Sequence, residues 1–292
     1  QCMRMGGQFH RRVLLPLFFG TLNAPPGKRA SRARSLGRIP FLNGGLFARS
    51  LVERRAGSWT YPHERFGALF DELFHRYRFV AREDTAPWSE ASVDPEMLGR
   101  AFECLMAVDD RRTSGVYFTP HALVAQVADE AIRSAFPDPT LRMVRTARVL
   151  DPACGSGAFL VYLLERLGDL RRGLGERGSV ATVRRDVLAR SIFGVDRNPT
   201  AVWLCELRLG LSVVIESEEE DPMSVPPLPN LDRNVRVGDA LAGEGFCQDL
   251  HGIAGSAGIE KLRAAYVRAT GSRKQHLART LDREERQRAL GH

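Results

Sequence analysis

The sequence predicts an α/β fold with a parallel sheet, preceded by a mostly helical N-terminal region. Residues 148–160 combine a short apolar run, a glycine-rich turn and a helix-periodic segment, the pattern of a strand–turn–helix unit. Residues 191–196 and 235–241 are two more short apolar segments that end in or near an acidic residue. Residues 66–77 and 94–106, by contrast, show only the spacing of amphipathic helices.

Length and composition describe an ordinary globular protein. The 292 residues are 43% hydrophobic and 26% charged, enough for a sizeable buried core. No apolar run approaches the roughly 18 residues of a membrane span, and residues 14–22 are too short and lack the cleavage site of a signal peptide. We therefore expect no membrane partner. The chain begins at Gln1 rather than Met, so we expect it to be a piece of something longer.

The net charge of +7 is compatible with a nucleic-acid partner, although much of the excess lies in arginine-rich tails. Five cysteines are scattered without paired spacing, which argues against a disulfide framework or a zinc site and suits a reducing cytoplasm. The basic segment at 28–38 has two open interpretations, a solvated loop or a segment that contacts phosphate. No feature indicates an oligomeric state.

Two amphipathic helices are expected in the N-terminal region. Six apolar residues recur at helical spacing and predict one buried stripe: Phe66, Leu69, Phe70, Leu73, Phe74 and Tyr77. We interpret this stripe as core rather than as a base-stacking surface. Asp94 is a good N-cap and Pro95 a good first residue for the second helix.

A further helix is predicted after residue 119, with Thr119 as its cap and Pro120 as its first residue. Its buried face is expected to hold four apolar residues: Leu123, Val124, Val127 and Ile132. The structural interpretation is simply a capped helix. The alternative is a role in ligand binding, because residues 117–120 lie shortly before the glycine-rich turn in the sequence.

The turn at residues 151–157 is the strongest candidate for a ligand site. Gly155 and Gly157 allow a tight backbone turn and let a ligand approach without a Cβ in the way. The helix that follows presents unpaired N–H groups to such a ligand. Leu160 stands where the dinucleotide fingerprint has its third glycine, which argues against a nicotinamide or flavin dehydrogenase.

Asp196 ends the second predicted strand, with Asn198 as the cap and Pro199 as the first residue of the next helix. A carboxylate at the tip of the second strand of a βαβ unit is placed to accept both ribose hydroxyls of an adenosine. Asp196 lies 39 residues after Gly157 rather than the usual distance of about 20, which we attribute to an inserted polar, arginine-rich stretch at 168–190.

The third predicted strand, at 235–241, contains Asp239, for which ligand binding and capping of a turn both stay open. Residues 216–229 are acidic and then proline-rich, which predicts a surface linker. Residues 259–290 are helix-like with a break at 271–272 and carry nine Lys or Arg against four Asp or Glu. This basic segment either reaches toward DNA phosphates or docks on other parts of the protein.

Four segments resemble motifs of the amino-group DNA methyltransferases, which bind S-adenosylmethionine (SAM). Residues 151–157, Asp-Pro-Ala-Cys-Gly-Ser-Gly, resemble motif I. Residues 193–199 resemble motif II, residues 235–241 motif III, and the Tyr-Phe-Thr-Pro at 117–120 motif X. The order X, I, II, III is that of adenine-N6 methyltransferases with the SAM-binding half first.

The resemblance covers roughly residues 38–292 and includes the segment at 42–47, which is similar to one found in large single-chain restriction–modification methyltransferases. It implies the N-terminal part of an adenine-specific DNA methyltransferase of the type II or IIG kind, with double-stranded DNA as partner. The implied fold is a Rossmann-like SAM-dependent methyltransferase fold with a partial sheet. The implied regions are a helical N-terminal region at 1–92, the first half of the SAM-binding domain at 93–258, and a basic helical segment at 259–292.

The resemblance also assigns the SAM-binding residues, which fall into four groups along the cofactor. They are Tyr117, Phe118, Thr119 and Pro120 near the methionine portion; Asp151, Ala153, Gly155 and Gly157 in the loop around it; Asp196 at the ribose; and Asp239 with Ala240 at the adenine ring.

The family's catalytic motif IV, Asn/Asp/Ser-Pro-Pro-aromatic, does not occur in the 292 residues. We therefore assign no catalytic residue and expect the chain to stop before its catalytic loop and to be inactive alone. Two alternatives stay open. One is a methyltransferase that acts on protein or RNA, and the other is a non-catalytic fragment that binds SAM or DNA.

Overall fold

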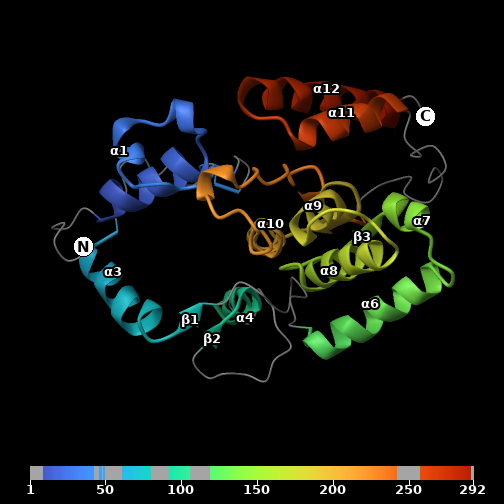
Figure 1. Ribbon diagram of the computed structural model, residues 1–292, viewed down its shortest axis with the longest axis horizontal. Helices are drawn as coiled ribbons and strands as arrows, with labels where there is room; N and C mark the ends of the chain where they lie inside the picture. Colours follow the sequence, from blue (N-terminus) through green and yellow to red (C-terminus); the bar gives the residue numbers. More distant parts are fainter. Residues whose placement is uncertain are drawn as a thin grey trace. The chain divides into compact units, whose positions relative to one another are not determined.

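A computed structural model describes residues 9–42, 46–47, 49, 61–79, 92–105, 119–241 and 257–290 of the chain (Figure 1). The chain divides into two compact units. One contains Gln1–Met106 and Gly210–Leu228, and the other contains Ala107–Leu209 and Pro229–His292. In the described ranges, no helix combines the length and apolarity that a membrane crossing requires.

The first unit is mostly helical in its described residues. Phe9 is buried, and its ring packs against Phe66 and Phe70 with centroid distances of 5.4 and 5.6 Å. A short parallel pair joins Arg78 to Ser92. The elements are η2 (His10–Leu14), η3 (Pro16–Leu22), η4 (Pro26–Lys28), α1 (Ser31–Arg34), α3 (His63–Leu69), η5 (Phe70–Phe74), β1 (Arg78–Phe79), β2 (Ser92–Val93), α4 (Pro95–Leu105) and η6 (Pro222–Ser224).

The predicted buried stripe of residues 66–77 is wrong in part. Leu69, Phe74 and Tyr77 are 39%, 43% and 38% exposed. The cause is a change of helix type: α3 ends at Leu69, and η5 continues the chain as π-helix. Because a π-helical turn contains more residues than an α-helical turn, side chains at i+3 and i+4 spacing no longer share one face.

The predicted N-cap of the second helix is present, and one arginine of the basic segment is buried. Helix α4 begins at Pro95, and the Asp94 carboxylate accepts a hydrogen bond from the N–H of Met97 at 2.9 Å, so the predicted cap is confirmed. In the basic segment at 28–38, Arg29 is buried and donates to the carbonyl oxygens of Thr21 and Ala24. Arg29 therefore braces a turn within the protein and is not part of a solvated loop.

The second unit contains the predicted parallel sheet. Its strands are β3 (Val149–Asp151), β4 (Ile192–Asp196) and β5 (Val235–Val237), in the order β3-β4-β5. Val149 pairs with Ile192, and Asp196 pairs with Val237. All three strands are parallel, so their carboxyl ends meet at one edge of the sheet. The predicted α/β class and the three strands are confirmed, but the third strand ends at Val237, before Asp239.

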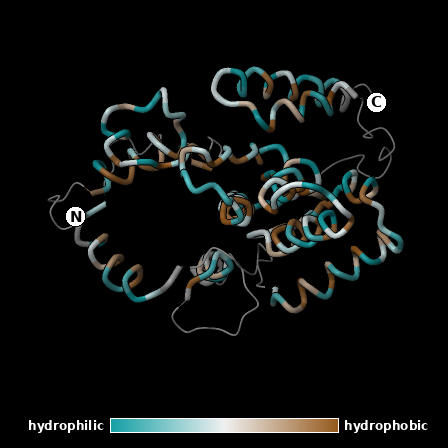
Figure 2. The backbone as a smooth tube through the Cα atoms, viewed as in Figure 1, coloured by the Kyte–Doolittle hydropathy of each residue, from teal (hydrophilic) through white to brown (hydrophobic). Residues whose placement is uncertain are grey.

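Seven helices accompany the sheet in the described chain: α6 (His121–Ala135), α7 (Leu141–Thr146), α8 (Ala158–Gly173), α9 (Val180–Arg190), α10 (Pro199–Val214), α11 (Ala257–Val267) and α12 (Gly271–Leu290). Helix α8 is the central one, because it packs on α6, α7, α9 and β4. Its buried side includes Leu160, Leu164 and Leu167. Figure 2 shows α10 as largely hydrophobic, whereas α12 is mostly hydrophilic.

The arginine-rich stretch at 168–190 consists of the end of α8, a short connection at 174–179 and helix α9. Helix α9 begins after Ser179, whose hydroxyl accepts a hydrogen bond from the N–H of Thr182. Arg171 is 1% exposed and donates to the carboxylates of Glu176 at 2.7 Å and Asp186 at 2.8 Å. A buried cation is tolerated here because two carboxylates surround it.

The predicted boundary and buried face of α6 need correction. Pro120 has an extended backbone and is itself the N-cap, without a side-chain hydrogen bond, so Thr119 does not cap this helix. Val124 is buried as predicted, but Leu123 and Val127 are each 48% exposed. Helix α6 packs on α8 along a narrow face, in which Ala128 takes the place expected for the larger side chains.

Two buried asparagines fix the segment that leads into β5. Asn234 donates its side-chain amide to the carbonyl oxygens of Leu188, Ala189 and Ile192 at 3.0–3.2 Å. It thereby satisfies the end of α9 and the start of β4 together. The backbone carbonyl oxygen of Asn234 accepts a hydrogen bond from the N–H of Gly194 at 2.9 Å. Asn230 has the same role at the end of α11, where its amide donates to three carbonyl oxygens: Tyr266, Val267 and Ala269.

We expect Asn234→Ala to lower the free energy of unfolding by about 3 kcal/mol, because it leaves buried carbonyl groups without a donor. Chemical denaturation would measure the change. The exposed Gln275→Ala serves as a control and should change stability by less than about 0.5 kcal/mol. A loss below about 1 kcal/mol for Asn234→Ala would contradict the assigned role of the amide.

A second prediction concerns acid stability. Hydrogen bonds from Arg171 and Arg145 lower the pKa of Glu176 from 4.5 to about 2. Its ionised form therefore stabilises the folded state above pH 4.5, and this contribution is lost as the pH falls toward 2. We therefore expect the wild type to be more stable than Glu176→Gln above pH 4.5. The difference between their unfolding free energies should shrink as the pH falls toward 2. The exposed ion-pair variant Glu130→Gln should show a smaller dependence, and equal behaviour of both variants would contradict the assignment.

Candidate functional site

The candidate site lies at the carboxyl edge of the parallel sheet, which is where open α/β sheets bind ligands. Three acidic residues gather there from three adjacent strands. Asp151 ends β3, Asp196 ends β4, and Asp239 follows β5 by two residues. The loop after β3 contains Gly155 and Gly157 and leads into α8, which begins at Ala158.

The loop between β3 and α8 depends on backbone conformations that favour glycine. Gly155 has a φ of 51° and Gly157 a φ of 92°, both in the left-handed region. Gly157 is the N-cap residue of α8, and its N–H donates to the carbonyl oxygen of Cys154 at 2.8 Å. The result is a tight turn that presents the first turn of α8 to the edge of the sheet.

Two glycines also allow close packing beneath this loop. A Cβ on Gly157 would lie 2.6 Å from the sulfur of Cys205 on α10. A Cβ on Gly194 of β4 would lie 2.7 Å from Leu160 and 3.0 Å from the sulfur of Cys154. The loop is therefore held between β4, α8 and α10 with no room for a methyl group.

The Asp196 carboxylate connects the two loops at the edge of the sheet. One of its oxygens accepts a hydrogen bond from the N–H of Gly155 at 2.9 Å, and the other accepts one from Asn198 at 2.8 Å. Each carboxylate oxygen has two lone pairs, so both can still accept a hydroxyl from a ligand. Asn198 in turn caps α10 by accepting hydrogen bonds from Thr200 and Ala201, as predicted.

Asp151 lies beside Asp196 in a less polar setting. Burial raises the pKa of the Asp151 carboxyl above its usual value, and the nearby Asp196 carboxylate acts in the same direction. A hydrogen bond of 3.1 Å from the N–H of Ala153 to the Asp151 carboxylate opposes both effects. The two carboxylates together make this edge attractive to a cation or to hydroxyl donors.

Asp239 has a local partner on each side of its carboxylate. One oxygen accepts a hydrogen bond from the N–H of Leu241 at 3.0 Å, and the other lies 3.6 Å from Arg197. The predicted turn cap is therefore present, and ligand binding by Asp239 stays a prediction. Gly238 donates to the carbonyl oxygen of Asp196 at 2.9 Å, which holds Asp239 and Ala240 close to the end of β4.

The structure describes the segment before α6 only from Thr119 on. Tyr117 and Phe118 lie outside the described residues, while Thr119 and Pro120 directly precede α6. The first residue of α6, His121, packs edge-on against Tyr162 of α8 with ring centroids 5.7 Å apart. This contact places the start of α6 beside the first turns of the helix that follows the glycine loop.

Sequence reasoning missed Arg208 of α10. Arg208 is buried and donates to the carbonyl oxygen of Ser156 at 2.9 Å and to its hydroxyl at 3.1 Å. Arg208 therefore stabilises the glycine loop through hydrogen bonds from α10. The available signal is an arginine between two leucines, Leu207 and Leu209, in the apolar part of a helix. Such a position is unfavourable for a cation unless it has a fixed partner.

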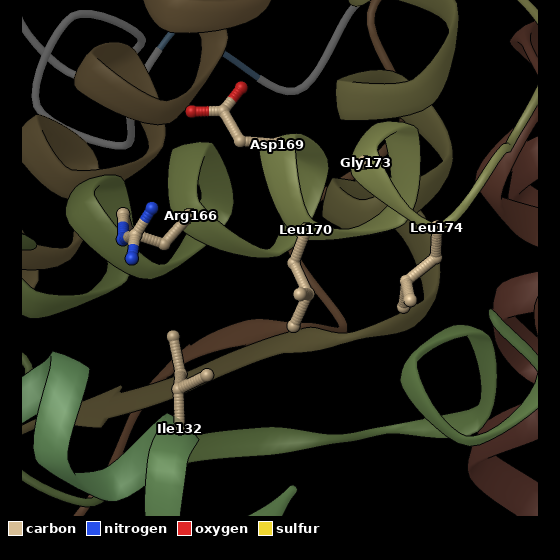
Figure 3. A pocket seen from close by; sticks show the side chains of 6 residues that line it. All are labelled: Ile132, Arg166, Asp169, Leu170, Gly173 and Leu174. Atoms are coloured by element: carbon tan, nitrogen blue, oxygen red, sulfur yellow. The ribbon is translucent and has the colours of Figure 1, made fainter. Parts of the chain in front are cut away.

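A separate pocket lies at the opposite end of α8 and is not this site. It has a volume of about 370 Å³ and lies between α6 and α8. Figure 3 shows Leu170 of α8 and Leu174, directly after α8, directed to the side on which Ile132 of α6 lies, while Asp169 points away. Within the described ranges, no three His, Cys, Asp or Glu side chains are grouped as metal ligands.

Comparisons with known proteins agree with the motifs. Residues 93–220 match the model of the N-6 DNA methylase family. The chain is also 25% identical over 283 residues to a putative type II restriction enzyme and methyltransferase, RM.MjaORFECS2P, from Methanocaldococcus jannaschii. These findings confirm the resemblance to methyltransferases of restriction–modification systems. The alignment covers 80% of this chain and 24% of the relative, so the chain spans about a quarter of that protein's length.

A solved structure shows the same fold. It is that of the type IIL restriction–modification enzyme MmeI in complex with DNA, with a TM-score of 0.55 and 20% sequence identity. The likeness covers 81% of this chain and 32% of the MmeI chain. The prediction of a Rossmann-like methyltransferase fold with a helical region before it is confirmed.

We expect Gly157→Ala to be about 1–3 kcal/mol more destabilising than Gly175→Ala, because only the first adds a steric clash. Gly175 is a matched control: its φ is 89°, and an added Cβ would meet nothing within 4 Å. Equilibrium unfolding of both variants would measure the difference. Adding Cys205→Ala to Gly157→Ala should recover part of the loss. Equal destabilisation by Gly157→Ala and Gly175→Ala would show that α10 does not confine the loop.

Proposed function

We propose that this chain is the SAM-binding part of a DNA methyltransferase that modifies adenine at N6 within a restriction–modification system. One observation carries the proposal. A glycine loop and three acidic residues meet at the carboxyl edge of a parallel sheet, and most of this arrangement falls in the segment that matches the N-6 DNA methylase family. We further propose a cytoplasmic protein with double-stranded DNA as its partner.

The chemistry of the edge fits SAM. SAM carries vicinal ribose hydroxyls, an ammonium group and a sulfonium, all of which suit an acidic environment. Asp196 keeps acceptor positions for both hydroxyls while it holds Gly155 and Asn198. A pyrophosphate, by contrast, would be repelled by the carboxylates of Asp151 and Asp196. The edge therefore favours SAM over a dinucleotide.

The remaining assignments follow the order of the motifs. We propose that the loop residues Asp151, Ala153, Gly155 and Gly157 surround the methionine portion, which Tyr117, Phe118, Thr119 and Pro120 also approach. Asp239 and Ala240 would meet the adenine ring, since Gly238 ties them to the end of β4. Arg208 would act as a positioning residue through Ser156.

The reaction requires groups beyond this binding edge. When bound, SAM supplies an electrophilic methyl group for transfer to an exocyclic amine. The residues of this chain would bind and orient the cofactor, while the target adenine is extruded from the duplex. Because the sequence contains no Asn/Asp/Ser-Pro-Pro-aromatic tetrapeptide, we propose no catalytic residue here and expect the chain alone to be inactive.

We propose three functional regions, at 1–92, 93–258 and 259–292, with the middle one holding the cofactor. A non-catalytic fragment that binds SAM or DNA is the second candidate, and the missing tetrapeptide favours it. Methylation of genomic DNA by the isolated chain would distinguish the two. Transfer to a protein or RNA substrate instead of DNA would identify the third candidate.

We expect Asp196→Ala to weaken SAM binding by more than about tenfold, because a bidentate acceptor is lost and the Gly155 N–H is left without its partner. Isothermal titration of the full chain with SAM would measure this. Asp196→Asn keeps one acceptor oxygen and should lie between the wild type and Asp196→Ala. Asp138→Ala, at an exposed loop position, should bind normally. Unchanged affinity in a folded Asp196→Ala protein would remove Asp196 from the site.

A further inference from the structure

The two C-terminal helices form a hairpin with its own small core (red in Figure 1). Ile259, Tyr266 and Leu281 are buried between α11 and α12. The turn between them ends at Gly271, which has a φ of 58° and begins α12. Asn230 holds the end of α11 through three carbonyl oxygens. The hairpin is therefore a defined element attached to the sheet by the segment before β5.

The acidic residues of the hairpin are occupied by arginines of the same unit. Glu260 pairs with Arg148 at 2.8 Å, and Asp282 pairs with Arg233 at 2.7 Å. Glu285 lies within 3.4 Å of Arg233 and 3.1 Å of Arg263. These pairs neutralise Glu260, Asp282 and Glu285 within the unit, through Arg148 next to β3, Arg233 before β5 and Arg263 on α11.

Several exposed basic residues of the hairpin have no such partners in the described part of the chain. Four of them are exposed and make no ion pair with the described part of the chain: Lys261, Arg268, Arg273 and Arg279. Arg268 and Arg273 flank the turn, and Arg279 lies on the same face of α12 as Arg273 and His276. Asp282 is the single acidic residue between residues 272 and 283, and it pairs with Arg233. We call Arg268, Arg273 and Arg279, which flank the turn or lie on one face of α12, the outer basic surface.

We propose that the outer basic surface binds the phosphate backbone of double-stranded DNA, an inference that rests on the proposed function. The distribution of ion pairs carries the proposal, because Glu260, Asp282 and Glu285 are paired within the unit and leave exposed arginines uncompensated. The span from Arg273 to Arg279 is about 9 Å along α12, comparable to the rise of about three phosphates on one strand. The contacts are independent of base sequence and so provide affinity rather than specificity.

The test compares two triple variants of the full chain. Arg268→Gln/Arg273→Gln/Arg279→Gln removes three cations of the outer basic surface. The control, with Arg142→Gln, Arg172→Gln and Arg177→Gln, removes three exposed arginines that likewise make no ion pair with described residues. Gln has a helix propensity close to that of Arg, which matters at the helical positions 273, 279, 142 and 172. Binding to a short fluorescein-labelled duplex is measured by fluorescence anisotropy between about 50 and 200 mM salt.

We expect the hairpin variant to bind the duplex at least about tenfold more weakly at low salt, with a salt dependence reduced by about three counterions. The control should change affinity less than about threefold. Equal losses in both variants would assign the effect to net charge and overturn the proposal, as would a wild-type chain that does not bind duplex. SAM titration of the same samples tests the proposed function separately, because the hairpin variant should bind SAM normally.

Discussion

The carboxyl edge of the sheet depends on the hydrogen bonds that the Asp196 carboxylate accepts. This carboxylate holds Gly155 from the loop after β3 and Asn198 from the loop after β4, so one side chain fixes two turns at once. A backbone N–H inside a protein needs a partner, and a charged acceptor is a strong one. The loop is therefore already shaped before any ligand arrives, which lowers the ordering cost of binding.

The parts of the fold that follow local rules could be predicted from the sequence. The strands that end at Asp151 and Asp196, and the helices that begin at Pro95 and Pro199, each have short-range signals in caps, prolines and apolar runs. Helix α9 was missed because its apolar spacing is diluted by arginines, and only its tertiary partners show which of them are buried. The boundary of α6 was placed one residue early, since Pro120 is also compatible with a position just outside a helix.

The candidate site shows the same division. Glycines and acids at strand ends are visible in the sequence, because their spacing reflects the turn itself. Arg208 and Asn234 are not, because their partners at Ser156 and Ile192 are 52 and 42 residues away along the chain. The net charge of the chain likewise does not show what each arginine does. Arg29 braces a turn, Arg171 sits between two carboxylates, and Arg273 faces solvent.

Gly194 has a consequence for how this protein can change over evolutionary time. Its backbone does not require glycine, yet a methyl group there would meet Leu160 and Cys154. Alanine is therefore acceptable at residue 194 only after one of these neighbours has become smaller. The order of the substitutions matters: the smaller neighbour first leaves a tolerable cavity, whereas alanine first passes through a poorly folding ancestor. Relatives should accordingly show paired rather than independent variation at these positions.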